Sequence, residues 1–155
     1  MRAVLQRVVR ASVRVASGAG NAGPEFARGI GPGFLVLLGV ARGDVQHDAD
    51  RLVEKIAGLR VFPDELGKMN LNIKQVQGEL LVVSQFTLLA DTRRGRRPSF
   101  AAAADPELGY ALYTYTVDRL RIAGLPVVTG DFGAHMQVEL VNDGPVTIVL
   151  DTREA

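Results

Sequence analysis

The chain has 155 residues, a formal net charge of +1 and a composition that is 47% hydrophobic and 23% charged. Such values are typical of a soluble globular protein, and a charge this close to zero excludes a global field that would draw the protein to nucleic acid. Cysteine is absent and histidine occurs only as His47 and His135, so disulfides, thiolate metal sites and cysteine nucleophiles are excluded and no multi-histidine metal site is expected.

A single domain over residues 1–155, using neither a metal nor a cofactor, is therefore expected. The apolar runs are too short to span a bilayer, and "MRAVLQRVVR" lacks the pattern of a signal peptide. These features favour a cytoplasmic location.

Hydrophobic periodicity predicts strands at both ends of the chain. Apolar and polar residues alternate over residues 3–15. One face carries Leu5, Val9, Ala11, Val13 and Val15, and Arg7 is the single charged residue on it. Residues 17–33 are rich in glycine and proline, which predicts an extended hairpin region. Further strands are predicted at 34–41, 79–90, 126–129, 136–142 and 145–151, the first of them buried on both faces.

Two segments switch to helical spacing. Over residues 48–60, one stripe is formed by Leu52, Val53, Ile56 and Leu59. A second helix is predicted from Asp105 to about Gly124, because Asp105-Pro106-Glu107 supplies a cap, a first-turn proline and an acid that favours the helix dipole. Its buried stripe is expected to contain Leu108, Ala111, Leu112 and Tyr115. The predicted fold is α+β, with a mainly antiparallel sheet or barrel-like core and two main helices.

Polar residues interrupt two of the predicted strands. Ser84 and Gln85 stand in "SQFT", and buried polar atoms must be paired with protein, water or ligand. Either the strand ends there and both residues bond neighbouring backbone, or they bind a ligand. "NDGP", residues 142–145, is either an ordinary tight turn or the site of a cis Gly-Pro bond. Periodicity does not choose between these interpretations.

No standard hydrolytic motif is present. A serine or threonine nucleophile needs an adjacent base, and both histidines are interpreted as surface or packing residues. "DTRRGRRPSF" gathers Arg93, Arg94, Arg96 and Arg97 around one glycine. Taken alone, this cluster is interpreted as a solvated loop, with phosphate binding as the alternative.

The combination of "SQFTLLAD" with "NDGPVT" about 55 residues later resembles the D-aminoacyl-tRNA deacylase, or D-tyrosyl-tRNA(Tyr) deacylase, family. The resemblance covers almost the whole chain, including "LQRVVRASVRV", "GPGFLVLLGV", "GKMNLNI", "RGRRPSF" and "ALYTYTVDRL". It implies the fold of that family and a homodimer that hydrolyses the ester joining a D-amino acid to the terminal adenosine of tRNA, so that free D-amino acid and tRNA are released.

The resemblance also implies how chirality is selected. Gly144-Pro145 would be cis and would enter the active site of the opposite subunit, with Asn142 and Thr147 in support. Rigid backbone oxygens there would leave room for hydrogen but collide with an L side chain. Because glycine has no side chain to reject, glycyl-tRNA, such as glycine mischarged on tRNA(Ala), is expected to be a substrate too.

The other roles carried over concern binding and catalysis. Ser84 and Gln85 would bind the terminal adenosine, Met136 would pack on its base, and the backbone carbonyl of Phe132 would hold the substrate amine. Thr87 is either a nucleophile or a positioning residue beside Gln85; without a base to activate it, we favour oxyanion stabilisation by the backbone around Phe86, assisted by the tRNA 2′-hydroxyl. The tRNA phosphates would be contacted by Arg94, Arg96 and Arg97.

Two other functions are compatible with parts of the sequence. One is a non-catalytic nucleic-acid-binding protein on the same fold, which would have no reason to keep both motifs. The other is a serine or threonine hydrolase of small esters, which the missing histidine–acid pair disfavours. Residues 17–28 are longer than the family's compact hairpin and are interpreted as a loop extension.

Overall fold

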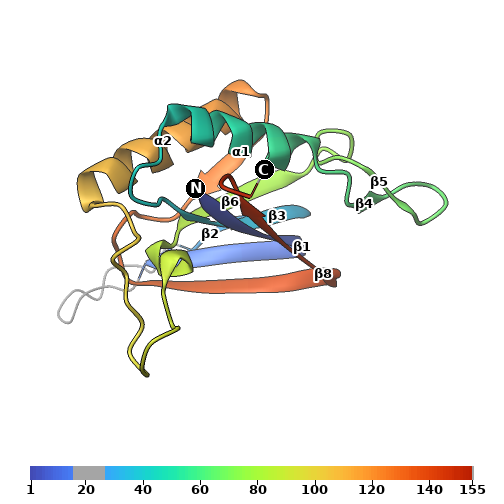
Figure 1. Ribbon diagram of the computed structural model, residues 1–155. Coiled ribbons are helices and arrows are strands. Elements are labelled where there is room, and N and C mark those ends of the chain that lie inside the picture. The colour runs from blue at the N-terminus through green and yellow to red at the C-terminus, as the bar shows by residue number, and fades with distance from the viewer. Residues whose placement is uncertain (16–26, 155) are drawn as a thin grey trace.

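The computed structural model describes residues 1–15 and 27–154, and in it two helices cover one face of a curved sheet (Figure 1). The main sheet contains β1 (Arg2–Val15), β2 (Arg28–Ile30), β3 (Gly33–Gly39), β6 (Glu79–Ser84), β7 (Val127–Thr129) and β8 (Met136–Asp151). Beside it lie a small ribbon and three helical segments: β4 (Phe62–Pro63), β5 (Met69–Leu71), α1 (Gln46–Gly58), the short 3₁₀ helix η1 (Phe86–Leu89) and α2 (Pro106–Ile122). The α+β class and the two main helices are confirmed.

The main sheet is mixed rather than purely antiparallel. β1 pairs antiparallel with β2, β3 and β8, whereas β6 pairs parallel with both β3 and β7. The parallel pairs arise because α1 connects β3 to β6 and α2 connects β6 to β7, as helical crossovers do. Arg28 of β2 donates to the carbonyl of Thr129 in β7 at 3.0 Å, so the sheet curls until its two flanks approach each other.

The curled sheet has a hydrophobic core on each face. Phe34, Val36 and Leu38 of β3 face the helices, and Leu35 joins the second cluster inside the curl. β6 divides its side chains in the same way. Both strands are therefore buried on both faces, which confirms the prediction for residues 34–41 over the length of β3.

Three of the strand predictions are wrong, two in the limits of the strands and one in the buried face. The strand predicted over 79–90 ends at Ser84, and η1 follows it. The strands predicted at 136–142 and 145–151 form one long strand, β8, which pairs with β1 on both sides of residues 143–146. Val9 is 49% exposed instead of facing the core, because β1 is irregular between Gln6 and Arg10 and its alternation shifts there.

The start of α2 is confirmed, whereas α1 spans Gln46–Gly58 instead of the predicted 48–60, and the buried face of α2 differs from the prediction. Asp105 caps α2 by accepting the N–H of Leu108 at 2.9 Å, and Pro106 opens the first turn. Ala111 is exposed. The face toward the sheet is formed by Gly109, Leu112, Tyr113, Thr116, Val117 and Leu120, so the helix is rotated relative to the expected stripe. Among the described residues, no helix combines the length and the apolar character needed to cross a membrane.

The hairpin region predicted over 17–33 is only partly described. Residues 17–26 lie outside the described residues. The end of the region forms β2, whose Ile30 pairs with Ala11 of β1.

Candidate active site

A cleft of about 510 Å³ opens where the ends of β3 and β6 meet the first half of α2 and the start of β8. Five of the predicted site residues line it: Ser84, Gln85, Phe86, Phe132 and Met136. They come from segments far apart in the chain, and the curl of the sheet brings them to one rim. The remaining predicted site residues lie elsewhere.

The turn from β6 into η1 places the SQFT segment against β3. Gln85 donates its backbone N–H to the carbonyl of Leu38 at 2.8 Å, which extends the strand pairing by one residue. Gly39 makes the close approach possible, since a Cβ there would stand 2.9 Å from the carbonyl oxygen of Gln85 and 2.5 Å from Leu89. The chain then turns away from the sheet and exposes Phe86.

Backbone donors at the start of η1 have no partner within that helix. The first intrahelical bond runs from the N–H of Leu88 to the carbonyl of Gln85 at 3.3 Å. The N–H groups of Phe86 and Thr87 precede that bond and belong to the unpaired donors that begin any helix. Two such donors side by side can hold a developing negative charge on oxygen.

Thr87 is exposed and is not among the residues that line the cleft. Its hydroxyl oxygen accepts a hydrogen bond from the side-chain amide of Gln85. Among the described residues, no histidine or carboxylate is hydrogen-bonded to Thr87. The contact fixes the Gln85 amide and supplies no base.

One wall of the cleft is aromatic and apolar. The Tyr113 hydroxyl donates to the carbonyl of Val82 at 2.9 Å, and burial raises the pKa of Tyr113 to about 12. The ring of Phe132 packs at 5.7 Å from that of Tyr113 and at 5.4 Å from that of Tyr110. The phenol stays neutral and acts structurally, because its hydrogen bond holds α2 against β6.

Three lining residues with polar or titratable side chains received no site role from the sequence: Asp105, Tyr113 and His135. The cap motif marked Asp105 as a helix start, and its carboxylate is engaged by that role. Tyr113 could have been found only by placing the buried face of α2 correctly. His135 adjoins Met136, and its position beside a predicted binding residue was the available signal.

Gly144 and Pro145 do not line this chain's cleft. They form an exposed turn that projects from β8, opposite Arg7 of β1, and the bond between them is cis. The φ of Gly144 is 149°, and a Cβ there would stand 2.7 Å from the amide nitrogen of Val146, so the turn requires glycine. Asn142 closes the turn: its side-chain oxygen accepts the N–H of Val146 at 2.7 Å, and its amide donates to the carbonyl of Val146 at 3.1 Å.

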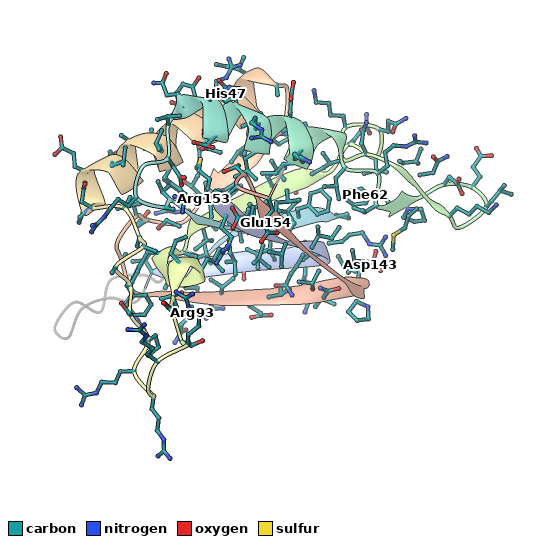
Figure 2. The ribbon with its side chains drawn as sticks, viewed as in Figure 1. His47, Phe62, Arg93, Asp143, Arg153 and Glu154 are labelled. Carbon is teal, nitrogen blue, oxygen red and sulfur yellow. The ribbon has the colours of Figure 1, made fainter. Side chains whose placement is uncertain are left out.

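Arg7 holds the same turn from the side of the core. The guanidinium donates to the carbonyl of Asp143 at 2.9 Å and to that of Val61 at 2.5 Å, and the side chain is only 10% exposed. Figure 2 shows Asp143 at the end of the lower arm of β8, beside this turn. Sequence reasoning assigns no role to Arg7, although its place as the one charge on an apolar strand face is the signal that could have identified it.

The arginine cluster lies on a loop that extends from η1 away from the sheet (Figure 1). Backbone bonds of 2.8 and 2.9 Å join Asp91 and Ser99 at its base. Arg93, labelled in Figure 2, pairs with Asp91 at 2.7 Å, and this contact lowers the pKa of Asp91 to about 2. Three exposed arginines at the tip have no hydrogen bond or ion pair with any described residue: Arg94, Arg96 and Arg97.

Comparisons with known proteins place the chain in one family. A family model described as D-Tyr-tRNA(Tyr) deacylase matches residues 4–151. D-aminoacyl-tRNA deacylases of Symbiobacterium thermophilum and Anaeromyxobacter dehalogenans are 56% and 57% identical, each over 99% of this chain and 97% and 98% of their own lengths.

Solved structures agree with that placement. A structure titled "c-Myc DNA Unwinding Element Binding Protein" has a TM-score of 0.86 and 42% identity over 97% of this chain and 98% of its own. A probable eukaryotic D-amino acid tRNA deacylase has a TM-score of 0.78 at 18% identity, over 96% of this chain and 97% of its own, and shares the fold. The resemblance seen in the sequence is confirmed, and the chain belongs to the D-Tyr-tRNA(Tyr) deacylase family of hydrolases.

Proposed function

We propose that the cleft binds the aminoacylated end of tRNA and hydrolyses the ester of D-aminoacyl-tRNA. The observation that carries the proposal is the rim of the cleft, where Ser84 and Gln85 stand directly before the unpaired N–H groups that begin η1. A nucleoside bound by the first two residues would place its ester beside those donors.

Each predicted binding residue has a place in this arrangement. Ser84 and Gln85 bind the terminal adenosine, and Met136, which lines the same cleft, packs against its base. The backbone carbonyl of Phe132 accepts a hydrogen bond from the ammonium group of the amino acid. The wall around Tyr113 is apolar, and the Asp105 carboxylate in the cleft lining is engaged as the cap of α2, so the substrate amine is recognised by hydrogen bonds to backbone.

Catalysis follows from positioning and charge stabilisation. Water attacks the ester carbonyl carbon, and the N–H groups of Phe86 and Thr87 hold the resulting oxyanion. The bond to the 3′ oxygen then breaks, and that oxygen takes up the proton lost by water, with the neighbouring 2′-hydroxyl as relay. Removing one oxyanion donor typically costs about 10²- to 10³-fold in rate, so this arrangement can supply a large part of the acceleration without a histidine.

Chirality is selected by a second copy of the chain. Gly144 and Pro145 are exposed on β8, which pairs only with β1 among the described strands and presents Val141 and Val149 to solvent. In a homodimer this turn enters the cleft of the partner, where its backbone collides with an L side chain and tolerates hydrogen. Asn142, with Thr147 beside it, and Arg7 keep the turn in place.

Two consequences concern the substrate. Glycine offers no side chain to the turn, so glycyl-tRNA, including glycine mischarged on tRNA(Ala), is hydrolysed as well. The tip arginines bind phosphates of the acceptor end. Because charged tRNA is made and used in the cytoplasm, the enzyme acts there.

A second candidate is nucleic-acid binding without catalysis. The observation that favours it is the 42% identical structure whose title names a DNA-unwinding-element binding protein. In such a protein the arginine loop would bind the nucleic acid, and the cleft would have no function.

The test is single-turnover hydrolysis of D-Tyr-, L-Tyr- and glycyl-tRNA by the purified protein. We expect rapid loss of the D-ester and the glycyl ester, with survival of the L-ester. Survival of all three esters together with salt-sensitive nucleic-acid binding would support the second candidate. Loss of the D-ester with complete inertness toward glycyl-tRNA at high enzyme concentration would overturn the steric account of selection.

A further inference from the structure

We propose that Phe86 and Phe100 form a stacking platform for the unpaired nucleotide that precedes the terminal adenosine of tRNA. The proposal rests on the function proposed above and extends it from the reacting ester to the next nucleotide of the acceptor end. It assigns a role to two exposed aromatic rings that do not belong to the hydrophobic core on either face of the sheet.

The two rings form a defined surface at the mouth of the cleft. Their centroids lie 5.0 Å apart at 70°, and the residues are 58% and 38% exposed. Phe86 lines the cleft. Phe100 directly follows Ser99, which is bonded to Asp91 at the base of the arginine loop, so its position is fixed by the backbone. Neither residue belongs to either hydrophobic cluster.

Charge indicates which ligand passes over this surface. Phe86 lines the cleft, and Phe100, whose ring contacts it, follows the bonded base of the loop that carries the three tip arginines, so the platform connects the cleft with that loop. An oligonucleotide end with its last base in the cleft and its phosphates toward the arginines must cross the two rings. Single-stranded RNA is commonly held by aromatic stacking combined with basic side chains, whereas an apolar peptide would gain nothing from the arginines.

The experiment compares a substrate that reaches the platform with one that does not. D-tyrosyl-tRNA contains the preceding nucleotide, and the D-tyrosyl ester of adenosine lacks it. We expect Phe100→Ala to lower the ratio of kcat/KM for the tRNA ester to that for the adenosine ester by roughly tenfold, as expected for one stacked base, chiefly through KM. Phe100→Tyr, which keeps a ring, should restore the ratio.

Ile122→Ala is the control, because Ile122 is 73% exposed near the end of α2 and lies outside the cleft lining. It should leave the ratio unchanged. An unchanged ratio in Phe100→Ala, whether both esters keep their rates or both lose them equally, would overturn the platform while the proposed function stands. If the wild-type protein cleaved neither ester, the proposed function would fail and the platform with it.

Discussion

At the scale of single residues, Arg7 connects the core of the molecule to the turn proposed to select the substrate. It is buried on β1 and bonds the carbonyls of Asp143 and Val61. Arg7→Ala leaves both acceptors without that donor, at a cost of about 1–3 kcal/mol of unfolding free energy. We also expect cleavage of L-Tyr-tRNA to rise relative to D-Tyr-tRNA, measured as the ratio of single-turnover rates.

The matched control is Arg10→Ala on the same strand. Arg10 is exposed, and its 3.9 Å pair with Glu139 is of the kind that contributes little to stability. Its stability and its ratio of rates should match the wild type. If Arg7→Ala lost stability but kept full discrimination between the two esters, Arg7 would be a structural residue without influence on selection.

A substitution of Thr87 distinguishes a mechanism with a threonine nucleophile from one in which backbone N–H groups stabilise the oxyanion. Its hydroxyl is bonded to Gln85, and no described acid or histidine stands ready to take its proton. Thr87→Ala should therefore keep substantial activity, whereas loss of a true nucleophile costs on the order of 10⁶-fold. Single-turnover hydrolysis of D-Tyr-tRNA checks this, and an inactive but folded variant would restore the nucleophile mechanism.

At the scale of elements, the contact between β3 and η1 determines where the strand β6 ends. A Cβ on Gly39 would meet the Gln85 carbonyl oxygen at 2.9 Å and push η1 away. Gly39→Ala should lower the unfolding free energy by about 1–3 kcal/mol and slow hydrolysis, because the donors of η1 move with it.

Gly58→Ala is the comparison for that variant. A Cβ at Gly58 meets nothing within 4 Å, and it stands in the last turn of α1. Chemical denaturation of both variants should show a loss for Gly39→Ala and none for Gly58→Ala. Equal stability and activity of the two would mean that η1 adapts freely and that its placement does not depend on Gly39.

The elements also show what the sequence could predict. Both helices were found because helical spacing and the Asp105-Pro106 start are local signals, and they are confirmed by the structure. The end of β6 was missed because Phe86, Leu88 and Leu89 are as compatible with a strand as the residues before them. In the structure these residues form η1 and pack against Gly39, a contact with a residue more than forty positions earlier in the chain that no local pattern shows.

In the site, too, local signals are visible in the sequence, whereas features that depend on contacts between distant segments are not. Ser84 and Gln85 were identified because polar residues stand out in an apolar run, and the structure places them on the cleft. The irregularity that exposes Val9 leaves no trace in the alternation of the sequence. Tyr113 was not identified, since its role depends on how α2 is rotated against the sheet.

At the scale of the whole molecule, the net charge of +1 hides an uneven distribution. Replacing Arg94, Arg96 and Arg97 with glutamine removes three exposed and unpaired charges from one loop. The slope of log affinity for tRNA against log salt should then become shallower by roughly two to three. Arg93→Gln is the control, because Arg93 is already paired with Asp91, and it should change the slope less. Equal slopes for the wild type and the triple variant would mean that this loop does not contact tRNA.

The proposed function requires that each active site combine one chain's cleft with its partner's Gly144-Pro145 turn. Mixed dimers test it most directly, with one chain carrying Ser84→Trp, which fills the cleft, and the other carrying Pro145→Ala, which alters the turn. The first homodimer should cleave neither D- nor L-Tyr-tRNA, and the second should cleave both.

In the mixed dimer, the open cleft belongs to the Pro145→Ala chain, and the turn that reaches it comes intact from the Ser84→Trp chain. The account predicts hydrolysis of D-Tyr-tRNA at about half the wild-type rate, since one site in two is open, and survival of L-Tyr-tRNA. Cleavage of L-Tyr-tRNA by the mixed dimer would contradict the account and place cleft and turn of one active site within the same chain.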